Sequence, residues 1–316
     1  MYKVQRHQIG RFDAVRLVNE LTHEYLEILT SFGAGINDFV IKNEKGQLVS
    51  VIEGYRTEKE VIHDHHTAFK GSKLSPFPNR IPEGKFTFDG KKYQLPVNEV
   101  ATNNQLHAML HCRPFDIVRE VGDENGAELV LTYDYKGTDQ GYPFPYLLTI
   151  TYKLDASGVS VTTALENKAD TTMPIGDGWH PYFRFENLNL VELQMGAAER
   201  LSSNVGNALS GEHGYKVAKI IGEESLDDCF EVNQEEKFSL QLKDSSNGIA
   251  LEIWQESKEN QYRYLQIYTP PTRQSIAVEP VSCVPNAFNT GHGLIVLKPN
   301  EKVSMSFGIK NILLNI

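Results

Sequence analysis

The amino-acid sequence predicts an all-β protein built as a large antiparallel β-sandwich. Apolar and polar residues alternate with a period of two along most of the 316-residue chain, which is typical of half-buried strands. These stretches are rich in β-branched residues, and turns that contain glycine separate them. No stretch carries apolar residues at the spacing of a long amphipathic helix. Many short strands with frequent turns over this length favour a sandwich or a related barrel.

The strands can be placed in chain order by their turns. The first clear hairpin spans residues 86–95 and turns at Asp89-Gly90, a pair that favours tight hairpin turns. A second hairpin spans residues 147–164 and a third spans residues 238–254, each with glycine in its loop. The chain closes on an alternating strand over residues 303–309. The loops between these strands hold most of the histidine, asparagine and arginine residues, where a rigid β-scaffold places a functional site.

Composition narrows the classes of function. The net charge of −10 argues against a nucleic-acid partner, because basic patches bind phosphate backbones, and weakly against strongly anionic substrates. Three scattered cysteines form no disulfide framework and fit a reducing compartment. No signal segment is visible, and no run approaches the roughly 18 apolar residues of a membrane helix. We therefore expect a cytoplasmic protein of one domain, residues 1–316, with neither a membrane nor a nucleic acid as partner.

Glu279 is the first candidate for a catalytic residue. It ends an apolar, strand-like run over residues 275–279, and Pro280 follows it directly. A buried carboxylate costs free energy unless it is paired or hydrogen-bonded, so a sequence rarely places one there without a function. Burial also raises the pKa of a carboxyl group toward neutrality, which makes it a usable proton acceptor.

Two loops supply further candidates. Residues 76–82 form a proline-stiffened segment that contains Asn79 and Arg80, and a guanidinium offers a planar fork of donors for hydroxyl or carboxylate oxygens. Residues 176–183 crowd glycines and aromatic residues around His180, a natural proton donor near neutral pH. Aromatic faces also suit the apolar face of a sugar ring. The alternatives are a solvated surface arginine and a histidine hydrogen-bonded in an aromatic corner of the core.

Two other segments are ambiguous by themselves. His107 and His111 are four residues apart, which would let them bind zinc from one helix face, but the metalloprotease pattern needs glutamate where Ala108 stands. Packing beside a core strand is the preferred interpretation for His111. Asp227 and Asp228 point to opposite faces if the chain is extended, so that one of them can face a pocket. A solvated acidic turn is the alternative.

The cluster of histidines at residues 63–66 suggests a metal site of the cupin type. Histidines at positions i and i+2 of a strand share a face, but such sites usually need a carboxylate a few residues later, and none follows here. We therefore predict a polar loop without a metal.

Taken together, these segments resemble the aldose 1-epimerase (galactose mutarotase) family over roughly residues 10 to 312, with the motifs in the family's order. The matching segments are residues 78–81 with the hairpin after them, residues 106–107, 180–183, 227–230, 268–269, 279–280 and 285–289. Ala108 stands where the family usually has glycine, and Arg184 where many members have asparagine. The family's fold, an extended antiparallel β-sandwich, agrees with the pattern of strands.

The resemblance implies an enzyme that interconverts the α and β anomers of a free aldose without a cofactor or metal. Glu279 would be the general base at the C1 hydroxyl, His180 the general acid at the ring oxygen, and His107 would steady the C1 hydroxyl. Substrate hydroxyls would be held by Arg80, Asn79 and Asp227. The implied partner is a small-molecule aldose, and the implied assembly is a monomer or homodimer.

Three alternatives stay open. A hexose-6-phosphate 1-epimerase uses the same acid and base but needs cations for the phosphate. Arg56, Arg113 and Arg184 are candidates, although the position resembling that family's phosphate arginine is His111. The net charge ranks this alternative second. A non-catalytic sugar-binding protein on the same fold is a different class, and a metal-dependent cupin-like enzyme is the most distant.

Overall fold

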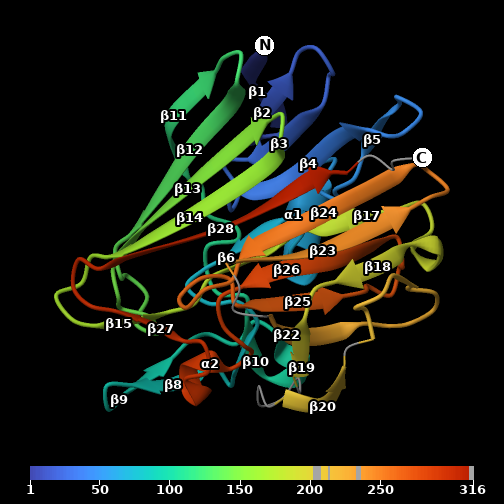
Figure 1. Cartoon of the computed structure of the whole chain (residues 1–316). Coiled ribbons are helices and arrows are strands. Elements are labelled where there is room, and N and C mark those ends of the chain that lie inside the picture. The colour runs from blue at the N-terminus through green and yellow to red at the C-terminus, as the bar shows by residue number, and fades with distance from the viewer. Residues whose placement is uncertain (202–207, 213, 233–235, 313–316) are drawn as a thin grey trace.

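Antiparallel strands make up most of the computed structural model, which describes residues 1–201, 208–212, 214–232 and 236–312 (Figure 1). The described residues include two α-helices, α1 (Glu58–Ala68) and α2 (Ala287–Thr290). Two short 3₁₀ helices span Val100–Thr102 and Leu188–Leu190. The predicted all-β class is therefore confirmed. No helix of the described part is both long and apolar enough to cross a membrane.

The larger sheet has nine strands in the described residues, and its central strands alternate buried and partly exposed side chains. In spatial order they are β11 (Asp116–Gly122), β12 (Gly126–Tyr135), β13 (Tyr146–Asp155), β14 (Gly158–Asn167), β28 (Lys302–Asn311), β24 (Ile249–Glu256), β23 (Lys237–Asp244), β18 (Glu192–Met195) and β21 (Lys219–Ile220). Figure 1 shows the C-terminal strand β28 between the green and orange strands of this sheet. Such alternation means that one face of the sheet packs on the core.

The second sheet has eight strands in the described residues. In order they are β20 (Ala208–Glu212), β19 (Ala198–Leu201), β22 (Asp227–Val232), β25 (Tyr264–Tyr268), β26 (Ser275–Val281), β16 (Gly178–His180) and β6 (Ser72–Leu74), with β17 (Tyr182–Arg184) also pairing with β26. Every residue of β26 is buried, so this strand is covered on both faces. Trp179 of this sheet contacts Tyr152 and Phe307 of the larger sheet. The main hydrophobic core therefore lies between the two sheets.

Smaller units flank this sandwich. An N-terminal sheet contains β1 (Tyr2–Ile9), β2 (Phe12–Asn19), β3 (Tyr25–Leu29), β4 (Gly35–Lys42) and β5 (Leu48–Ser50). Two-stranded units pair β7 (Arg80–Pro82) with β10 (Asn104–Leu106), β8 (Lys85–Phe88) with β9 (Lys91–Gln94), and β15 (Met173–Ile175) with β27 (Ile295–Leu297). Figure 1 shows β8, β9 and α2 together at one end of the molecule.

The three predicted hairpins are confirmed as β8–β9, β13–β14 and β23–β24. The prediction of a polar loop at residues 63–66 is wrong, because these residues lie within α1. Thr57 caps this helix by accepting a hydrogen bond from the Glu60 backbone N–H. Only Val61 and His65 of the helix are buried, so the apolar periodicity that identifies a helix is almost absent. His107 and His111 share no helix either, since both lie in a loop after β10.

Candidate active site

Glu279 lies near the end of β26, at the centre of the second sheet. Its side chain is buried, with 3% of the residue exposed. Burial raises the pKa of Glu279 well above its usual value; the nearby negative charge of Asp227 raises it further, and the positive charge of Arg80 partly offsets this. The register of the sheet places Gln266 of β25 opposite Glu279. The carboxyl group is thus desolvated, as the sequence argument required.

His180 ends the short strand β16, beside β26. Its Nε2 lies 3.3 Å from Oε1 of Glu279. The imidazole is also buried, and burial lowers its pKa to about 4. Its ring stacks on Tyr182, with centroids 4.8 Å apart, and its Nδ1 has no hydrogen-bond partner in the described part of the chain.

The opposite pKa shifts of Glu279 and His180 give the pair one proton over a broad range of pH. Either the carboxyl group is protonated beside a neutral imidazole, or a carboxylate faces an imidazolium. Both forms are neutral overall, which is the state that a buried, poorly solvated site favours. The apparent pKa values therefore belong to the pair rather than to either residue.

His107 is fixed by contacts with Asn79. Its backbone N–H donates to the Asn79 carbonyl oxygen at 2.9 Å, and its Nδ1 accepts from the Asn79 backbone N–H at 3.1 Å. Since Nδ1 is an acceptor, a neutral His107 carries its proton on Nε2. Burial, His180 and Arg80 all lower the pKa of His107 well below its usual value. The ring packs edge-on against His180, with centroids 5.2 Å apart, so His107 is a neutral hydrogen-bond donor beside the pair.

Arg80 begins β7 and is held by Glu99. Its Nε and Nη2 donate to the two Glu99 carboxylate oxygens at 2.9 and 2.7 Å. This contact, with further hydrogen bonds from Thr102 and Asn104, lowers the pKa of Glu99 to about 2 despite partial burial. The side chain of Asn79 accepts from the Arg80 backbone N–H at 2.9 Å. The guanidinium is therefore pre-positioned, because a bidentate pair fixes its plane.

Asp227 and Asp228 follow the predicted division between two faces of a strand. Asp227, the first residue of β22, is exposed, and its Oδ1 accepts from the Gln266 side chain at 2.8 Å. Asp228 is buried and binds Arg200 instead. Gln266 therefore lies between Asp227, to which it donates, and Glu279, its partner in the sheet register. The structure brings together the six residues singled out from the sequence. Direct contacts link Asn79 to His107 and Arg80, His107 to His180, and His180 to Glu279. The charges of Arg80 and Asp227 act on Glu279.

Neither Gln266 nor Glu99 was singled out from the sequence. A signal for Gln266 existed: a lone amide in the run Tyr-Leu-Gln-Ile-Tyr at residues 264–268 is as anomalous as a carboxylate in an apolar strand. Gln266 is 6% exposed, and a buried amide needs hydrogen-bond partners. No comparable signal marks Glu99, because its partner Arg80 is distant in the sequence.

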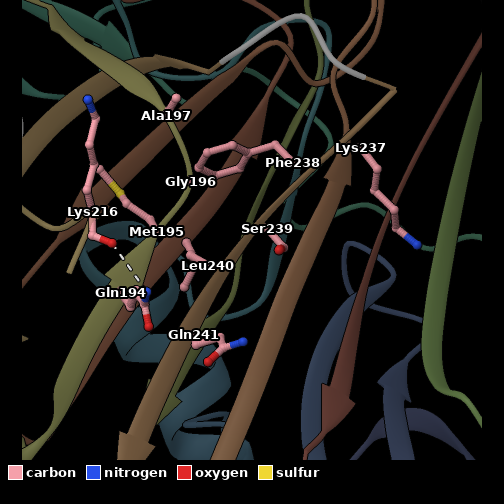
Figure 2. Close-up of a pocket in the computed structure, with 10 residues that line it drawn as sticks. All are labelled: Gln194, Met195, Gly196, Ala197, Lys216, Lys237, Phe238, Ser239, Leu240 and Gln241. Carbon is pink, nitrogen blue, oxygen red and sulfur yellow. Dashed lines mark hydrogen bonds between the residues drawn. The ribbon is translucent and has the colours of Figure 1, made fainter. Parts of the chain in front are cut away.

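A separate hollow of about 370 Å³ lies beside β18 and β23 (Figure 2). Its lining includes Met195, Phe238 and Lys237, and Gln194 donates to the Lys216 carbonyl oxygen across one side at 3.2 Å. Among the described residues that line it, none is a carboxylate or a histidine. The described lining of this hollow therefore offers no acid–base pair.

The family model for aldose 1-epimerase matches residues 17–310. The chain belongs to the aldose 1-epimerase family, which confirms the resemblance found in the sequence. It is 29% identical over 255 residues to the uncharacterised Escherichia coli protein YihR, covering 77% of this chain and 79% of YihR. It is 27% identical over 224 residues to an aldose 1-epimerase of E. coli, covering 66% of this chain and 62% of that protein.

Solved structures show the same fold. A galactose mutarotase-like protein from Clostridium acetobutylicum superposes with a TM-score of 0.85 at 17% identity, over 99% of both chains. A galactose 1-epimerase from Lactobacillus acidophilus superposes with a TM-score of 0.78 at 19% identity, also over 99% of both chains. These likenesses establish the galactose mutarotase-like sandwich and confirm the predicted fold class.

Proposed function

We propose that this chain is an aldose 1-epimerase that interconverts the α and β anomers of a free aldose. The proposal depends chiefly on the buried pair of Glu279 and His180, whose facing atoms are 3.3 Å apart. In a pyranose the C1 hydroxyl oxygen and the ring oxygen are bonded to the same carbon. An acid and a base that act on both oxygens must therefore be close neighbours, as these two groups are.

The pair performs the reaction from its carboxylate–imidazolium form. Glu279 takes the proton of the C1 hydroxyl while His180 donates its proton to the ring oxygen, and the bond between C1 and the ring oxygen breaks to give an open-chain aldehyde. Rotation about the C1–C2 bond presents the other face of the aldehyde. The ring then closes with both proton transfers reversed, so the enzyme returns to its initial state without a cofactor.

Neighbouring residues hold the sugar during these steps. The Nε2–H of His107 donates to the C1 oxygen as the aldehyde forms, which stabilises the charge that develops there. Arg80 and Asp227 bind ring hydroxyls, with Glu99 and Gln266 orienting them. We assign Asn79 a positioning role. Its backbone N–H donates to Nδ1 of His107, and its side-chain oxygen accepts from the Arg80 backbone N–H. The three cysteines are free thiols, which supports a reducing compartment such as the cytoplasm.

The test is the substitution Glu279→Gln, which keeps the shape of the side chain and removes the base. We expect the rate of mutarotation, followed by polarimetry on freshly dissolved α-glucose or α-galactose, to fall by about 10²–10⁴-fold. Sugar affinity, measured by calorimetry, should change far less. Glu166→Gln, at a partly exposed position near the end of β14, is a matched control and should keep full activity.

Two outcomes would contradict the proposal. A near-normal rate in the Glu279→Gln protein would remove Glu279 from the mechanism. Tight sugar binding by the unmodified protein without any acceleration of mutarotation would instead favour a carbohydrate-binding protein on the same fold.

A further inference from the structure

Three histidines gather outside the sugar site, where α1 meets the loop after β10. They are His65 and His66 of the helix and His111 of the loop, and one ring nitrogen from each lies within 4.8 Å of the others. The ring centroids of His65 and His66 are 3.6 Å apart, and those of His65 and His111 are 6.1 Å apart. The proposed epimerase mechanism uses none of them.

His65 already has the hydrogen bond of a metal ligand. Its Nδ1 lies 2.8 Å from the carbonyl oxygen of Val61, and a carbonyl can only accept, so Nδ1 carries the proton. In the neutral imidazole Nε2 then presents its lone pair. Histidines that bind metals almost always donate their other N–H to a carbonyl or carboxylate in this way, which fixes the ring and its tautomer.

His111 is buried and incompletely satisfied. It is 8% exposed, and its Nδ1 has no hydrogen-bond partner in the described residues. A buried polar atom without a partner costs free energy and calls for an explanation such as a bound ion.

The position of His111 is also rigid. Gly33 has a φ of +68°, and a Cβ there would lie 2.1 Å from the His111 carbonyl oxygen. The Gly33 N–H donates to the Arg113 carbonyl oxygen at 2.7 Å. The loop is therefore held against the N-terminal sheet, as a preformed ligand position requires.

We propose that His65, His66 and His111 form a binding site for one divalent transition-metal ion, with Zn²⁺ the metal best suited to it. Three neutral imidazoles suit zinc, copper or nickel and not the oxygen-seeking Mg²⁺ or Ca²⁺. At the tetrahedral angle, Zn–N bonds of about 2.0–2.1 Å put two ligand nitrogens about 3.4 Å apart. A separation of 4.8 Å must thus close by about 1.4 Å, which rotation about the side-chain torsions supplies.

The metal would stabilise the structure rather than react with the sugar. The ring of Phe69 separates the two places: its centroid lies 5.1 Å from that of His111 and 4.7 Å from that of His107. An ion held by both α1 and the loop would tie the helix to the segment that carries His107. Its expected effect is therefore on the stability of the fold, and only indirectly on the sugar site.

Isothermal titration of the metal-free, tag-free protein with Zn²⁺ tests the site, together with thermal unfolding. We expect one Zn²⁺ per chain and a rise in Tm of roughly a few degrees at saturating zinc, with no rise in Mg²⁺. His66→Ala should weaken zinc binding at least tenfold and abolish the rise in Tm. Because His66 is exposed, this variant leaves the core filled and should fold normally.

His63→Ala is the matched control, since His63 is an exposed histidine of the same helix outside the cluster. Its zinc affinity should stay within about twofold of the unmodified protein. Absence of saturable zinc binding would overturn the proposal. So would a loss of affinity that is equal in the His63→Ala and His66→Ala proteins, or full affinity in the His66→Ala protein.

Discussion

Glu279 and His180 titrate as one unit because both are buried and their facing atoms are 3.3 Å apart. A second proton on the pair creates a buried positive charge, and loss of the last proton creates a buried negative charge. Burial disfavours both charged forms. The form with a single proton is therefore the stable one, and the proposed reaction starts from its carboxylate–imidazolium arrangement.

This coupling predicts how the pH dependence of kcat/KM responds to nearby charges. We expect a bell-shaped profile whose limbs report the two ionisations of the pair in the free enzyme. The negative charge of Asp227 raises the pKa of Glu279, and the positive charge of Arg80 lowers it. Asp227→Asn should accordingly move both limbs to lower pH, and Arg80→Met should move both to higher pH.

The direction of each shift separates electrostatics from substrate binding. Losing a hydroxyl contact lowers kcat/KM at every pH but does not move the limbs. Asp134→Asn, which removes an exposed carboxylate of β12 that pairs with Lys136, is the control and should leave the profile in place. Limbs that stay fixed in both site variants, or that move in the same direction in the Asp227→Asn and Arg80→Met proteins, would contradict the one-proton pair.

At the residue scale, the sequence identifies residue types that are unusual for their surroundings but not the contacts that those residues make. Glu279 could be identified because a carboxylate in an apolar strand is costly wherever the strand packs. The tautomer of His107 could not, because it depends on a contact with Asn79 across 28 positions of the chain. The same holds for the pairing of Arg80 with Glu99, which follows from the folding of β7 against β10.

At the scale of elements, two strands of only three residues, β16 and β6, carry His180 into the site. Lys73 of β6 forms an ion pair with Asp177, and both side chains are fully buried. Lys73 also donates to the Gly178 carbonyl oxygen at 3.2 Å, and the Tyr262 hydroxyl donates to Asp177 at 2.8 Å. These contacts fix the register of strands that have few backbone hydrogen bonds of their own.

Removing one partner of this buried pair should destabilise the protein severely. Lys73→Met leaves the Asp177 carboxylate without its counter-charge, and such changes cost about 3–5 kcal/mol. Urea titration measures the loss in the free energy of unfolding. Lys153→Met, which breaks an exposed pair with Glu128, should cost less than about 1 kcal/mol.

The double substitution Lys73→Met with Asp177→Asn distinguishes an unpaired charge from lost packing. Replacing the unpaired Asp177 carboxylate with an amide should restore part of the stability, because burying an amide costs less free energy than burying a carboxylate. If the double variant is as unstable as the sum of the single ones, the ion pair does not hold these strands.

A helix or strand could be predicted where the residues that determine it lie close together in the sequence. The hairpins β8–β9, β13–β14 and β23–β24 were predicted because their turns and alternation lie within a short segment. The helix α1 was missed because it is mostly polar, and its stability comes from capping at Thr57 and from Val61 packing on the N-terminal sheet. Strands as short as β6 and β16 carry no measurable periodicity and exist only through their neighbours.

At the scale of the whole molecule, charge bears on which sugar the site accepts. The net charge is −10, and the Asp227 carboxylate places negative charge near Glu279. Two arginines of the chain form ion pairs with carboxylates: Arg56 with Asp38 at 2.7 Å and Arg80 with Glu99. The position resembling the phosphate arginine of hexose-6-phosphate epimerases is His111, which is buried. A phosphorylated sugar would therefore approach a negative surface with little cationic compensation.

We accordingly predict that kcat/KM for glucose 6-phosphate is at least tenfold lower than for glucose at low ionic strength. Repulsion between an anionic substrate and an acidic protein slows their association, and salt screens it over about 10 Å at 0.1 M. The difference in kcat/KM between the two substrates should therefore narrow as salt is added, while kcat/KM for neutral glucose stays constant. Polarimetry of both α anomers at low and high ionic strength measures this. Equal or faster turnover of glucose 6-phosphate would mean that a local cation outweighs the net negative charge of the protein. If Arg113→Gln or Arg184→Gln then lowered turnover of glucose 6-phosphate relative to glucose, the substituted arginine would be that cation.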